Sequence, residues 1–519
     1  MSSGRGAVAG GSPLTVEAGL SALRRGGNAV DAAVAAQLMA CVSEPLLTGL
    51  AGAGLAMVRM GGRVEALDLF STVPTLPAHS APQPEAVTID FGPTSQTFHV
   101  GAASVAAPAL PAGLWAMHER HGKLPMAQLA EPAAKAATRG VPVTAGFERV
   151  LRLLWPIQQR DPRCTDLFGH PSVPGTAPQP LREGDTFSNP DLARTIRQFA
   201  AEGPGLFSEG SVAEAILDEI GVQGRLREAD LLAYRPRLLE PIAYRYRDAV
   251  VWLPPTPSLA GMLVAQALRA LEDHGPMPKY ASARQMRFLS HALDRVDHTR
   301  RGALRKRLFD TSFTDGFLTA LCLQEMGEEA AHGKVDPRRP GNTTHISTVD
   351  ADGNAVAITT SLGETAGLVA GNTGVVLNNL LGEADVNPPD VDLEAGGRLM
   401  TMCCPTLLEL GGSVFGMGSG GSSRIRSAVL HGIVYLTDHG LAPEEAVSAP
   451  RLHVEDGVAH VEVDGRSPAT IQALRAGPWQ IRTFTGANMF FGGLHIAGLD
   501  RGVFSGAGDP RRSGAYGTA

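Results

Sequence analysis

The chain has 519 residues, a net charge of −7 and a pI near 6.1. This length predicts one large domain or two to four small ones. A hydrophobic share of 44% and a charged share of 19% are typical of a globular protein. The acidic balance provides no basic surface, so we expect no nucleic-acid partner.

No membrane segment is expected. Residues 1–15 carry one arginine and no apolar run, unlike a secretory signal. Residues 29–58 are the most apolar stretch, but Asp31, Glu44, Pro45 and several glycines interrupt it. Neither uninterrupted piece reaches the ~20 residues that a membrane-spanning helix requires. We therefore expect a soluble, cytoplasmic protein with no membrane partner.

The cysteines show no metal-binding or redox spacing. They number five, and the only close pair is adjacent: Cys41, Cys164, Cys322, Cys403 and Cys404. Reduced, buried thiols are expected, and a redox-active adjacent pair is the less favoured alternative. Because the sequence also lacks a metal-ligand cluster and a phosphate loop, we expect no cofactor and no metal.

The first part of the chain is predicted to be rich in helices. Residues 14–40 should form two helices, because Val16 and Leu20 recur at helical spacing and Asn28 can cap the second helix. Residues 48–60 follow as an apolar strand. Its glycines indicate either close packing of the backbone or only a tight turn.

The middle of the chain alternates helical patterns with turns. Proline-rich residues 75–100 are predicted to be a loop, and residues 110–240 to contain several helices. Residues 249–261 predict a strand that enters a proline-rich loop. Residues 281–332 are predicted to be helical, with the basic cluster 300–307 on a solvated face; anion binding by this cluster is the alternative.

After residue 333 the pattern changes to strands. Strands are predicted at residues 344–350, 355–361, 374–379, 414–420 and 458–465, and a helix at 428–440. The sequence "ADGN" between the first two strands indicates a hairpin turn. Since the chain shows no internal repeat and no flexible linker, both parts are expected to share one core in a layered α/β architecture.

The stretch "GNTTHISTVD" places two threonines and a histidine at the start of a predicted strand. A threonine at a new N-terminus can use its own α-amine as the base, so that no histidine is required. The chain could expose Thr343 by cutting itself at Asn342–Thr343. The glycine-rich stretch 416–424 could supply backbone N–H groups to an oxyanion. On these residues alone, ordinary β-propensity explains the Thr-Thr-His equally well.

Motifs along nearly the whole chain decide between a catalytic threonine and ordinary strand sequence. "GGNAVDAAVA", "TTHISTVDADGNAVAITTSLG" and "GSGGSSRI" resemble signatures of the γ-glutamyltranspeptidase family of N-terminal-nucleophile (Ntn) hydrolases. The resembling segments are, in chain order, residues 26–35, 110–125, 182–196, 226–234, 343–363, 418–425 and 508–517. Their order and spacing together are more specific than any one of them.

This resemblance implies a four-layer αββα sandwich, made jointly by two subunits that are cut from one precursor and then bind each other. The large, helix-rich subunit would be residues 1–342, and the small, strand-rich subunit would be residues 343–519, with one shared core. The catalytic residues that the resemblance implies are the nucleophile Thr343, the assisting hydroxyl of Ser361, and the oxyanion pair Gly421 and Ser422. Asn342 and Thr343 form the processing site.

The positions that resemble the family's substrate site depart from its pattern. Phe70 stands where the family has a carboxylate-binding arginine, Gly363 where it has asparagine, and Leu380 where it has glutamine. The remaining members of the predicted substrate site are Glu383 for an amine-binding aspartate, and Thr401 and Met402 for a serine pair. The changes remove charge and hydrogen-bonding groups, so γ-glutamyl affinity should be low. The short segment 383–398 predicts an open pocket.

We therefore expect a self-processing hydrolase with a small-molecule, non-γ-glutamyl substrate. The altered pocket resembles that of family members in the pathways to the 4-alkylproline units of lincosamide and pyrrolobenzodiazepine antibiotics, which are assigned carbon–carbon bond cleavage. A threonine oxygen that attacks a keto carbonyl would use the same catalytic groups. Amide cleavage and the balance of hydrolysis and transfer stay open, as does a higher homo-oligomer.

Two alternatives differ in class. The first is a conventional γ-glutamyl hydrolase or transpeptidase, in which Arg59 or Arg424 replaces the missing cation. The second is an uncleaved, non-enzymatic binding protein of the same family. The amine-base mechanism leaves His345 without a required proton transfer, so a local hydrogen-bonding or packing role is expected for it.

Overall fold

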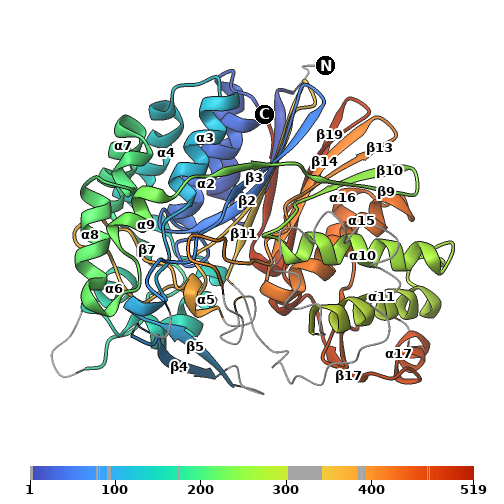
Figure 1. Ribbon diagram of the computed structural model, residues 1–519. Helices are drawn as coiled ribbons and strands as arrows, with labels where there is room; N and C mark the ends of the chain where they lie inside the picture. The colour runs from blue at the N-terminus through green and yellow to red at the C-terminus, as the bar shows by residue number, and fades with distance from the viewer. Residues whose placement is uncertain are drawn as a thin grey trace.

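The computed structural model describes residues 4–77, 80, 82–90, 95–171, 176–301, 342–383, 387, 393–464, 466 and 468–519. Over these ranges the chain forms four layers, in which two sheets face each other and helices cover both outer faces (Figure 1). The αββα sandwich predicted from the resemblance is confirmed.

The first sheet has seven strands in the order β20-β1-β11-β12-β2-β3-β8. The strands are β1 (Gly6–Gly10), β2 (Ala53–Met60), β3 (Arg63–Leu69), β8 (Arg237–Leu239), β11 (Thr344–Asp350), β12 (Ala355–Ser361) and β20 (Ala515–Thr518). The predicted hairpin turn connects β11 to β12, and Thr344 pairs with Thr360. The residues that begin β11 and end β12 therefore lie at one end of the sheet.

The second sheet has six strands in the order β19-β18-β14-β13-β10-β9. They are β9 (Ile242–Tyr246), β10 (Ala249–Leu253), β13 (Thr406–Leu410), β14 (Ser413–Gly420), β18 (Gly493–Asp500) and β19 (Val503–Ala507). Small side chains such as Ala9, Ala357 and Ala497 fill much of the space between the two sheets. Small residues let the sheets approach closely, and both sheets take strands from both sides of Thr343.

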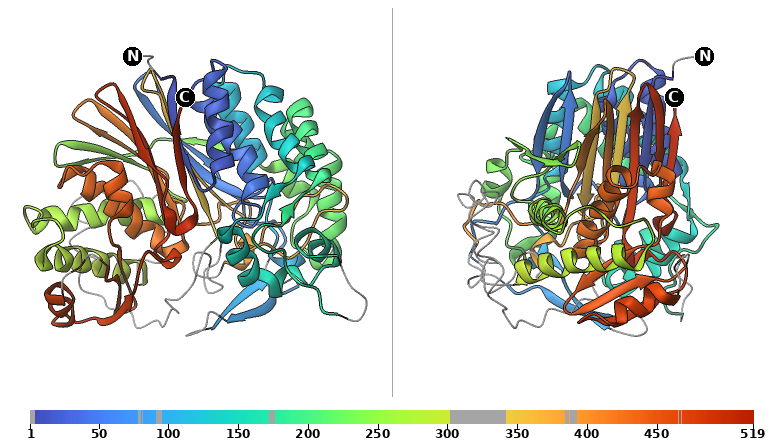
Figure 2. Two further views of the ribbon diagram at one scale, coloured as in Figure 1. Left: turned by 180° about the vertical axis from the view of Figure 1, so that it is seen from behind. Right: turned by 90° about the vertical axis from the view of Figure 1, so that its right-hand side faces the viewer.

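Helices α1 to α9 cover the first sheet, and α10, α11, α15 and α16 lie over the second, as the two further views show (Figure 2). Their bounds are α1 (Pro13–Arg24), α2 (Ala29–Ser43), α3 (Leu110–His121), α4 (Met126–Arg139), α5 (Ala145–Gln158), α6 (Pro162–Phe168), α7 (Pro190–Glu202), α8 (Ser211–Ile220), α9 (Glu228–Ala233), α10 (Leu259–Asp273), α11 (Ala283–Arg301), α15 (Ile425–Thr437), α16 (Pro443–Ser448) and α17 (Pro468–Arg475). The predicted cap is confirmed, since Asn28 Oδ1 accepts the N–H groups of Val30 and Asp31.

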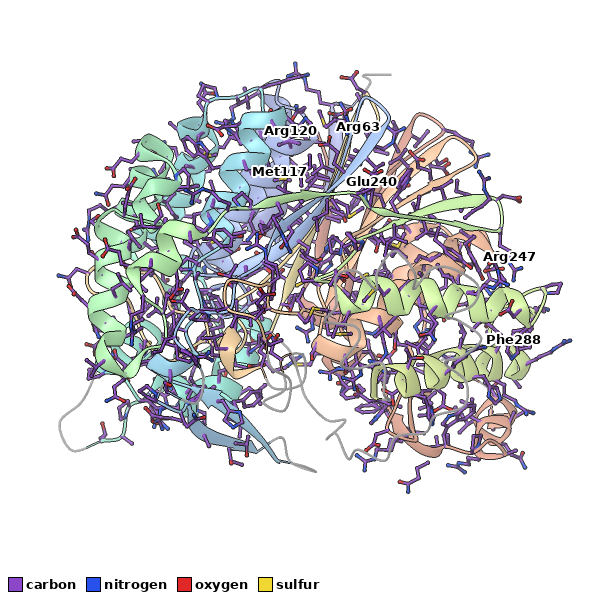
Figure 3. The ribbon with its side chains drawn as sticks, viewed as in Figure 1. Arg63, Met117, Arg120, Glu240, Arg247 and Phe288 are labelled. Carbon is purple, nitrogen blue, oxygen red and sulfur yellow. The ribbon has the colours of Figure 1, made fainter. Side chains whose placement is uncertain are left out.

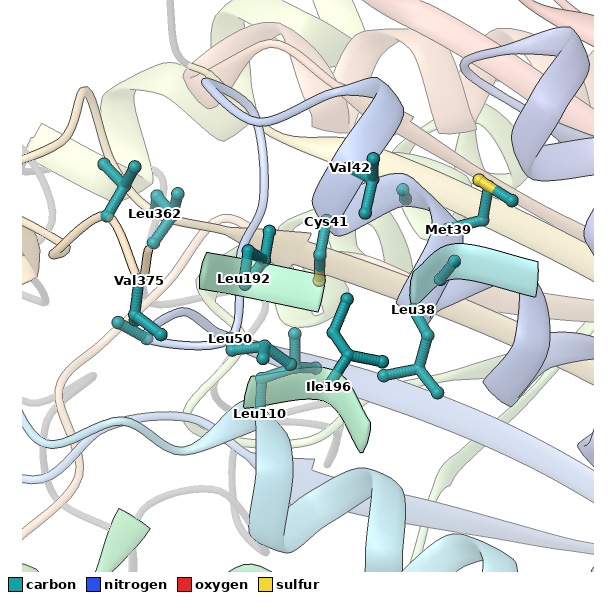
Figure 4. Close-up of a cluster of buried hydrophobic side chains, with 14 of the residues drawn as sticks. Leu38, Met39, Cys41, Val42, Leu50, Leu110, Leu192, Ile196, Leu362 and Val375 are labelled. Atoms are coloured by element: carbon teal, nitrogen blue, oxygen red, sulfur yellow. The ribbon is translucent and has the colours of Figure 1, made fainter. Parts of the chain in front are cut away.

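Beneath α2 lies the larger hydrophobic core, which anchors the strand that carries Ser361. Leu38, Leu50 and Ile196 pack there with Leu362, the residue after Ser361 (Figure 4). At the opposite end of the sandwich, Arg63 and Arg120 both bind the carboxylate of Glu65 (Figure 3). Apolar packing therefore surrounds the end of the sheet that holds Ser361, whereas ion pairs lie at the opposite end.

Three sequence-based predictions are wrong. Residues 75–100 are not only a loop, because β4 (Glu85–Asp90) and β5 (Ser95–Val100) form an antiparallel hairpin there. Residues 374–379 form no strand; a single bridge joins Val369 to Val376. Within the basic cluster 300–307, Arg300 is buried instead of solvated, and residues 302–307 lie outside the described part.

The four described cysteines are free and buried, as predicted, and Cys322 lies outside the described residues. Burial raises the pKa of the Cys403 and Cys404 thiols to about 12. Thiols with such values stay protonated at neutral pH and are poor nucleophiles. Among the described residues, no helix is both long and apolar enough to cross a membrane.

Candidate active site

The predicted processing bond lies at the end of the first sheet. Thr343 immediately precedes β11 and is buried, with 6% of its surface exposed. The hydroxyl of Ser361, at the end of neighbouring β12, donates a 2.6 Å hydrogen bond to the carbonyl oxygen of Asn342. The N–H of Gly363 donates in turn to Ser361 Oγ at 2.9 Å. Ser361 is therefore placed to polarise the carbonyl that Thr343 would attack.

Thr344 is fixed by a buried acid that the sequence did not reveal. Its hydroxyl donates to Glu44 Oε2 at 2.5 Å, and Thr15 donates to Glu44 Oε1 at 2.7 Å. Burial raises the pKa of the Glu44 carboxyl, although both hydroxyl donors oppose the shift. Because neighbouring strand residues point to opposite faces, this contact holds Thr344 toward the helices α1 and α2.

His345 lies between the two sheets and has a local role, as predicted. Its Nδ1 lies 2.8 Å from the hydroxyl of Thr359, and its Nε2 lies 2.8 Å from the hydroxyl of Ser347. Burial and the nearby His495 lower the pKa of His345 well below its ordinary value. The ring is neutral at physiological pH, and both of its nitrogens are occupied by neighbouring hydroxyls.

The predicted oxyanion residues follow β14 and lie beside Thr343. Gly420 packs so closely that a Cβ atom there would lie 2.0 Å from the carbonyl oxygen of Thr343. Gly421 and Ser422 have φ angles of +126° and +50°. The 3-10 turn η6 (Ser422–Arg424) then runs directly into α15. The first N–H groups of a helix have no acceptor within the helix, so this position suits the binding of an oxyanion.

A buried ionic network supports the oxyanion turn from behind. Ser423, the residue after Ser422, donates its hydroxyl to Glu455 Oε2 at 3.0 Å. Arg300 of α11 binds the other oxygen of Glu455 at 2.5 Å. Burial opposes ionisation of Glu455, but Arg300 and His453 hold the pKa of this carboxyl well below its usual range. A buried carboxylate thus connects the oxyanion turn to helix α11.

Two of the predicted substrate residues meet in one apolar cluster. Phe70 and Leu380 are both buried, and they share the cluster with Leu399, Cys403 and Tyr234. Phe70 follows β3, and its N–H donates to Asp68 Oδ1 at 2.9 Å. The position that the resemblance assigns to a cation is therefore packed against hydrocarbon.

Gly363 and Glu383 also lie close together. Gly363 has a φ angle of +66°, and a Cβ atom there would lie 2.1 Å from Asn379 Oδ1 and 3.3 Å from Glu383 Oε1. Any larger side chain would displace Asn379. The glycine is therefore required by the local packing as well as by the backbone conformation.

Thr401 and Met402 face different surroundings. The hydroxyl of Thr401 accepts the N–H of Cys403 at 3.1 Å, on the side of the Phe70 cluster. Met402 instead belongs to the core beneath the second sheet, together with Met400 and Cys404. The alternation of side chains along this segment separates the two residues, so we leave Met402 out of the proposed pocket.

Neither arginine of the conventional alternative reaches this cluster. Arg59 lies at the far end of β2, where it binds Glu409 and the carbonyl of Gly353. Arg424 is buried in η6 and donates to the carbonyl of Phe490. The sequence did not single out Arg398, which binds the Asp68 carboxylate at 2.8 Å and covers the Tyr234 ring. Arg398 shares the Asp68 carboxylate with Arg237.

Over the described part of the chain, no group of three or more histidine, cysteine, aspartate or glutamate side chains could hold a metal ion. The reactive groups that the geometry does bring together are hydroxyls, backbone amides and one prospective α-amine. An αββα sandwich that begins a central strand just after a buried threonine has the arrangement of an Ntn hydrolase.

Comparison with known proteins agrees with this class. The Gamma-glutamyltranspeptidase family matches residues 15–519. The chain therefore belongs to the γ-glutamyltranspeptidase family and is an Ntn-hydrolase enzyme.

Two relatives have names that state different activities. The Acylase ACY 1 proenzyme of Pseudomonas sp. (strain SE83) is 33% identical over 496 residues, which covers 92% of this chain and 87% of that protein. The Glutathione hydrolase proenzyme of Escherichia coli (strain K12) is 29% identical over 503 residues, covering 91% and 85%. Relatives of both kinds are thus comparably similar.

Solved structures support the fold. Cephalosporin acylase from Bacillus halodurans superposes with a TM-score of 0.83 at 24% identity, covering 99% of this chain and 96% of that one. A structure described as LmbA2991HD superposes with a TM-score of 0.79 at 21% identity, covering 99% and 98%. At these identities the similarity concerns the fold.

Proposed function

We propose that this protein is a self-processing hydrolase that cuts its own Asn342–Thr343 bond and then uses Thr343 on a small-molecule substrate other than a γ-glutamyl amide. The cut yields a large subunit of residues 1–342 and a small subunit of residues 343–519, which stay together. The observation that carries the substrate proposal is the burial of Phe70 and Leu380 in one apolar cluster.

The processing step follows from the contacts of the scissile carbonyl. Thr343 Oγ attacks the carbonyl carbon of Asn342, while the Ser361 hydroxyl, 2.6 Å from the carbonyl oxygen, stabilises the developing negative charge. The acyl group moves from nitrogen to oxygen, which leaves an ester and a free α-amine on Thr343. Water hydrolyses the ester and releases the carboxylate of Asn342.

In turnover, the new α-amine takes the proton of Thr343 Oγ as the oxygen attacks the substrate carbonyl. The N–H groups of Gly421 and Ser422 stabilise the tetrahedral oxyanion. The departing group receives the proton, and an acyl ester forms on Thr343. Water then attacks this ester with the amine as base, which releases the acid and restores Thr343.

The recognition side favours an apolar donor. A γ-glutamyl unit brings a carboxylate and an ammonium group, and an unpaired buried charge costs several kcal/mol. The described side chains of the Phe70 cluster itself carry no cation for such a carboxylate. The neighbouring Arg398 is held by the Asp68 carboxylate, which it shares with Arg237. The 33% identity to a protein named an acylase supports an acyl group as the part of the substrate that Thr343 takes up.

The bond that is cut in the substrate is either an amide bond or a carbon–carbon bond. With an amide substrate the departing group is an amine. With a 4-substituted pyrroline carboxylate bearing a keto group, the departing carbon takes the proton through an enamine, and a short carboxylic acid leaves from Thr343. Both reactions need the same nucleophile, base and oxyanion donors. The loss of charged groups around Phe70 supports either one over a glutamyl amide.

Purified protein should be tested first by denaturing electrophoresis and mass spectrometry. Two bands are expected, the smaller with 177 residues and Thr343 at its N-terminus. A single full-length band after prolonged incubation would instead support the uncleaved binding protein. The processed enzyme is then offered a γ-glutamyl anilide, an aliphatic or aromatic acyl anilide, and a keto-substituted pyrroline carboxylate with analysis for a released acid. Family-typical turnover of the γ-glutamyl anilide would overturn the substrate proposal.

A further inference from the structure

A cavity of about 240 Å³ lies behind the processing strand, and we call it the boundary cavity. Its walls come from both sides of the Asn342–Thr343 bond. The segment after the bond supplies Met489 and residues 511–513. The segment before it supplies residues 11–14 and 43–47, together with Pro142, Thr144, Gly146, Phe147, Arg149 and Val150. None of these residues belongs to the Phe70 cluster, so the two sites are distinct.

The lining of the boundary cavity is mainly apolar. The hydrocarbon comes from Leu14, Leu46, Leu47, Phe147, Val150 and Met489. A cavity of roughly 150 Å³ with such a lining accommodates benzene. The boundary cavity therefore has room for a ligand about the size of one fused ring system.

Two polar walls connect the cavity to the catalytic groups. Glu44 accepts the hydroxyl of Thr344, the neighbour of the nucleophile. Arg512 lies against the oxyanion residues, because Cβ atoms on Gly420 and Gly421 would each lie 3.5 Å from one of its terminal nitrogens. A molecule in the cavity thus lies one side chain, Arg512, away from the oxyanion turn, and Glu44 and Thr344 stand between it and Thr343.

The charges of the lining select the ligand further. Arg149 and Arg512 contribute to the wall, against the single acid Glu44. A third lining arginine, Arg511, is already bound to Glu462 and Asp509. Burial lowers the pKa of Arg512 to about 10, which leaves the guanidinium charged at neutral pH. An apolar ring is therefore accepted when it is neutral or carries a carboxylate, and an ammonium group on it is disfavoured.

We propose that the boundary cavity is a second ligand subsite, which takes a compact apolar ring, neutral or anionic, from the departing part of the substrate. Its place in turnover rests on the function proposed above. Its binding of a ring does not, since the cavity needs neither the cut nor an acyl ester.

The binding test uses three rings that differ in charge: indole, indole-3-acetate and tryptamine. Calorimetric or ligand-observed NMR titration of the full chain should give saturable binding of the first two and at least tenfold weaker binding of tryptamine. Leu47→Trp, which fills the cavity, should weaken the binding of indole at least tenfold. Leu232→Trp places the same indole side chain on an exposed position of α9 and serves as the matched control.

Met489→Phe fills the cavity from the opposite wall and should also weaken the binding of indole. This second variant keeps the test valid if Leu47→Trp does not fold. Equal indole affinity in parent and both filled variants, or equal affinity for tryptamine, would overturn the proposal. In the processed enzyme, indole should raise KM for whichever substrate is turned over and leave kcat unchanged. Active, processed enzyme without this competition would contradict the subsite alone, whereas uncut protein that binds indole would contradict the proposed function alone.

Discussion

The catalytic side and the recognition side of the site are built from different materials. Around Thr343 the groups are backbone atoms and small hydroxyls, and Gly420 has no room for even one carbon. Around Phe70 the contacts are side chains packed on side chains. Backbone geometry cannot be exchanged one residue at a time, whereas a side-chain wall can. This difference explains how a chain can keep one chemistry and change its substrate.

The largest effect is expected from Thr343→Ala, which removes the oxygen that both processing and turnover require. Processing should stop, and activity should fall by at least about 10⁴-fold, as for other nucleophile deletions. Thr343→Ser keeps a hydroxyl and should still process, which gives the matched control. Both are read on denaturing gels and by product release. Turnover that persists in the alanine variant would remove Thr343 from the mechanism.

Gly420→Ala tests whether the catalytic side depends on its backbone. The added carbon would lie 2.0 Å from the carbonyl of Thr343, so the strand end must move. We expect loss of processing with retention of the fold by circular dichroism. Gly416→Ala in the same strand meets Ser347 only at 3.3 Å and is the control. Normal processing of Gly420→Ala would mean that the close contact between Gly420 and the Thr343 carbonyl is not needed.

Glu455→Gln tests whether the oxyanion turn is held by the buried carboxylate. The amide can still accept from Ser423, but it removes the nearer of two negative charges beside Arg300 and leaves Asp297 at 3.6 Å. We expect kcat to fall roughly 10- to 100-fold with little change in KM, less than for loss of a direct oxyanion donor. Arg300 lies on α11, whereas Glu455 ends the strand β15 (Leu452–Glu455). If the two act as one pair, Arg300→Met in the Glu455→Gln background should add little further loss. If Glu455→Gln lowers the thermal stability and leaves the kcat of the folded enzyme unchanged, Glu455 has a purely structural role.

The double variant Phe70→Arg, Leu380→Gln tests whether these two positions determine which acyl donor the enzyme accepts. The pair restores the cation and the amide that the family resemblance expects, so γ-glutamyl anilide turnover should rise, by about tenfold, while turnover of the native substrate class falls. Phe70→Leu keeps the wall apolar and should leave γ-glutamyl turnover low. No gain in a folded, processed double variant would show that these two positions do not set donor choice.

The last prediction concerns stability instead of activity, and it is a pH dependence on the catalytic side. Burial lowers the pKa of His453 and of His495 to about 4 each. The unfolded chain binds these protons near pH 6.5. The stability is therefore fully present above pH 6.5 and is lost as the pH falls toward 4, by up to about 3 kcal/mol per histidine. Thermal unfolding between pH 7 and 4.5 should show it, and His495→Gln should flatten the curve. A flat profile for the parent would contradict the burial of neutral imidazoles.

The sequence predicted those parts of the fold that local patterns determine. The hairpin of β11 and β12 and the Asn28 cap follow from turn and capping chemistry over a few residues. The β4–β5 hairpin was missed because its prolines and polar residues resemble a loop. Glu44, Glu455 and Arg398 were missed for another reason. Their partners lie 300, 32 and 330 residues away, and no periodicity encodes such contacts.

The placement of β1 has a consequence for synthesis on the ribosome. Residues 6–10 pair with β11 on one side and with β20 on the other. The first strand to emerge thus has no partner until residues 344–350 and finally 515–518 have been made. The sheet edge beside Thr343 is therefore complete only after translation of the last strand. If the proposed self-cleavage requires this complete sheet, it follows translation of the last strand, when the small subunit is already whole.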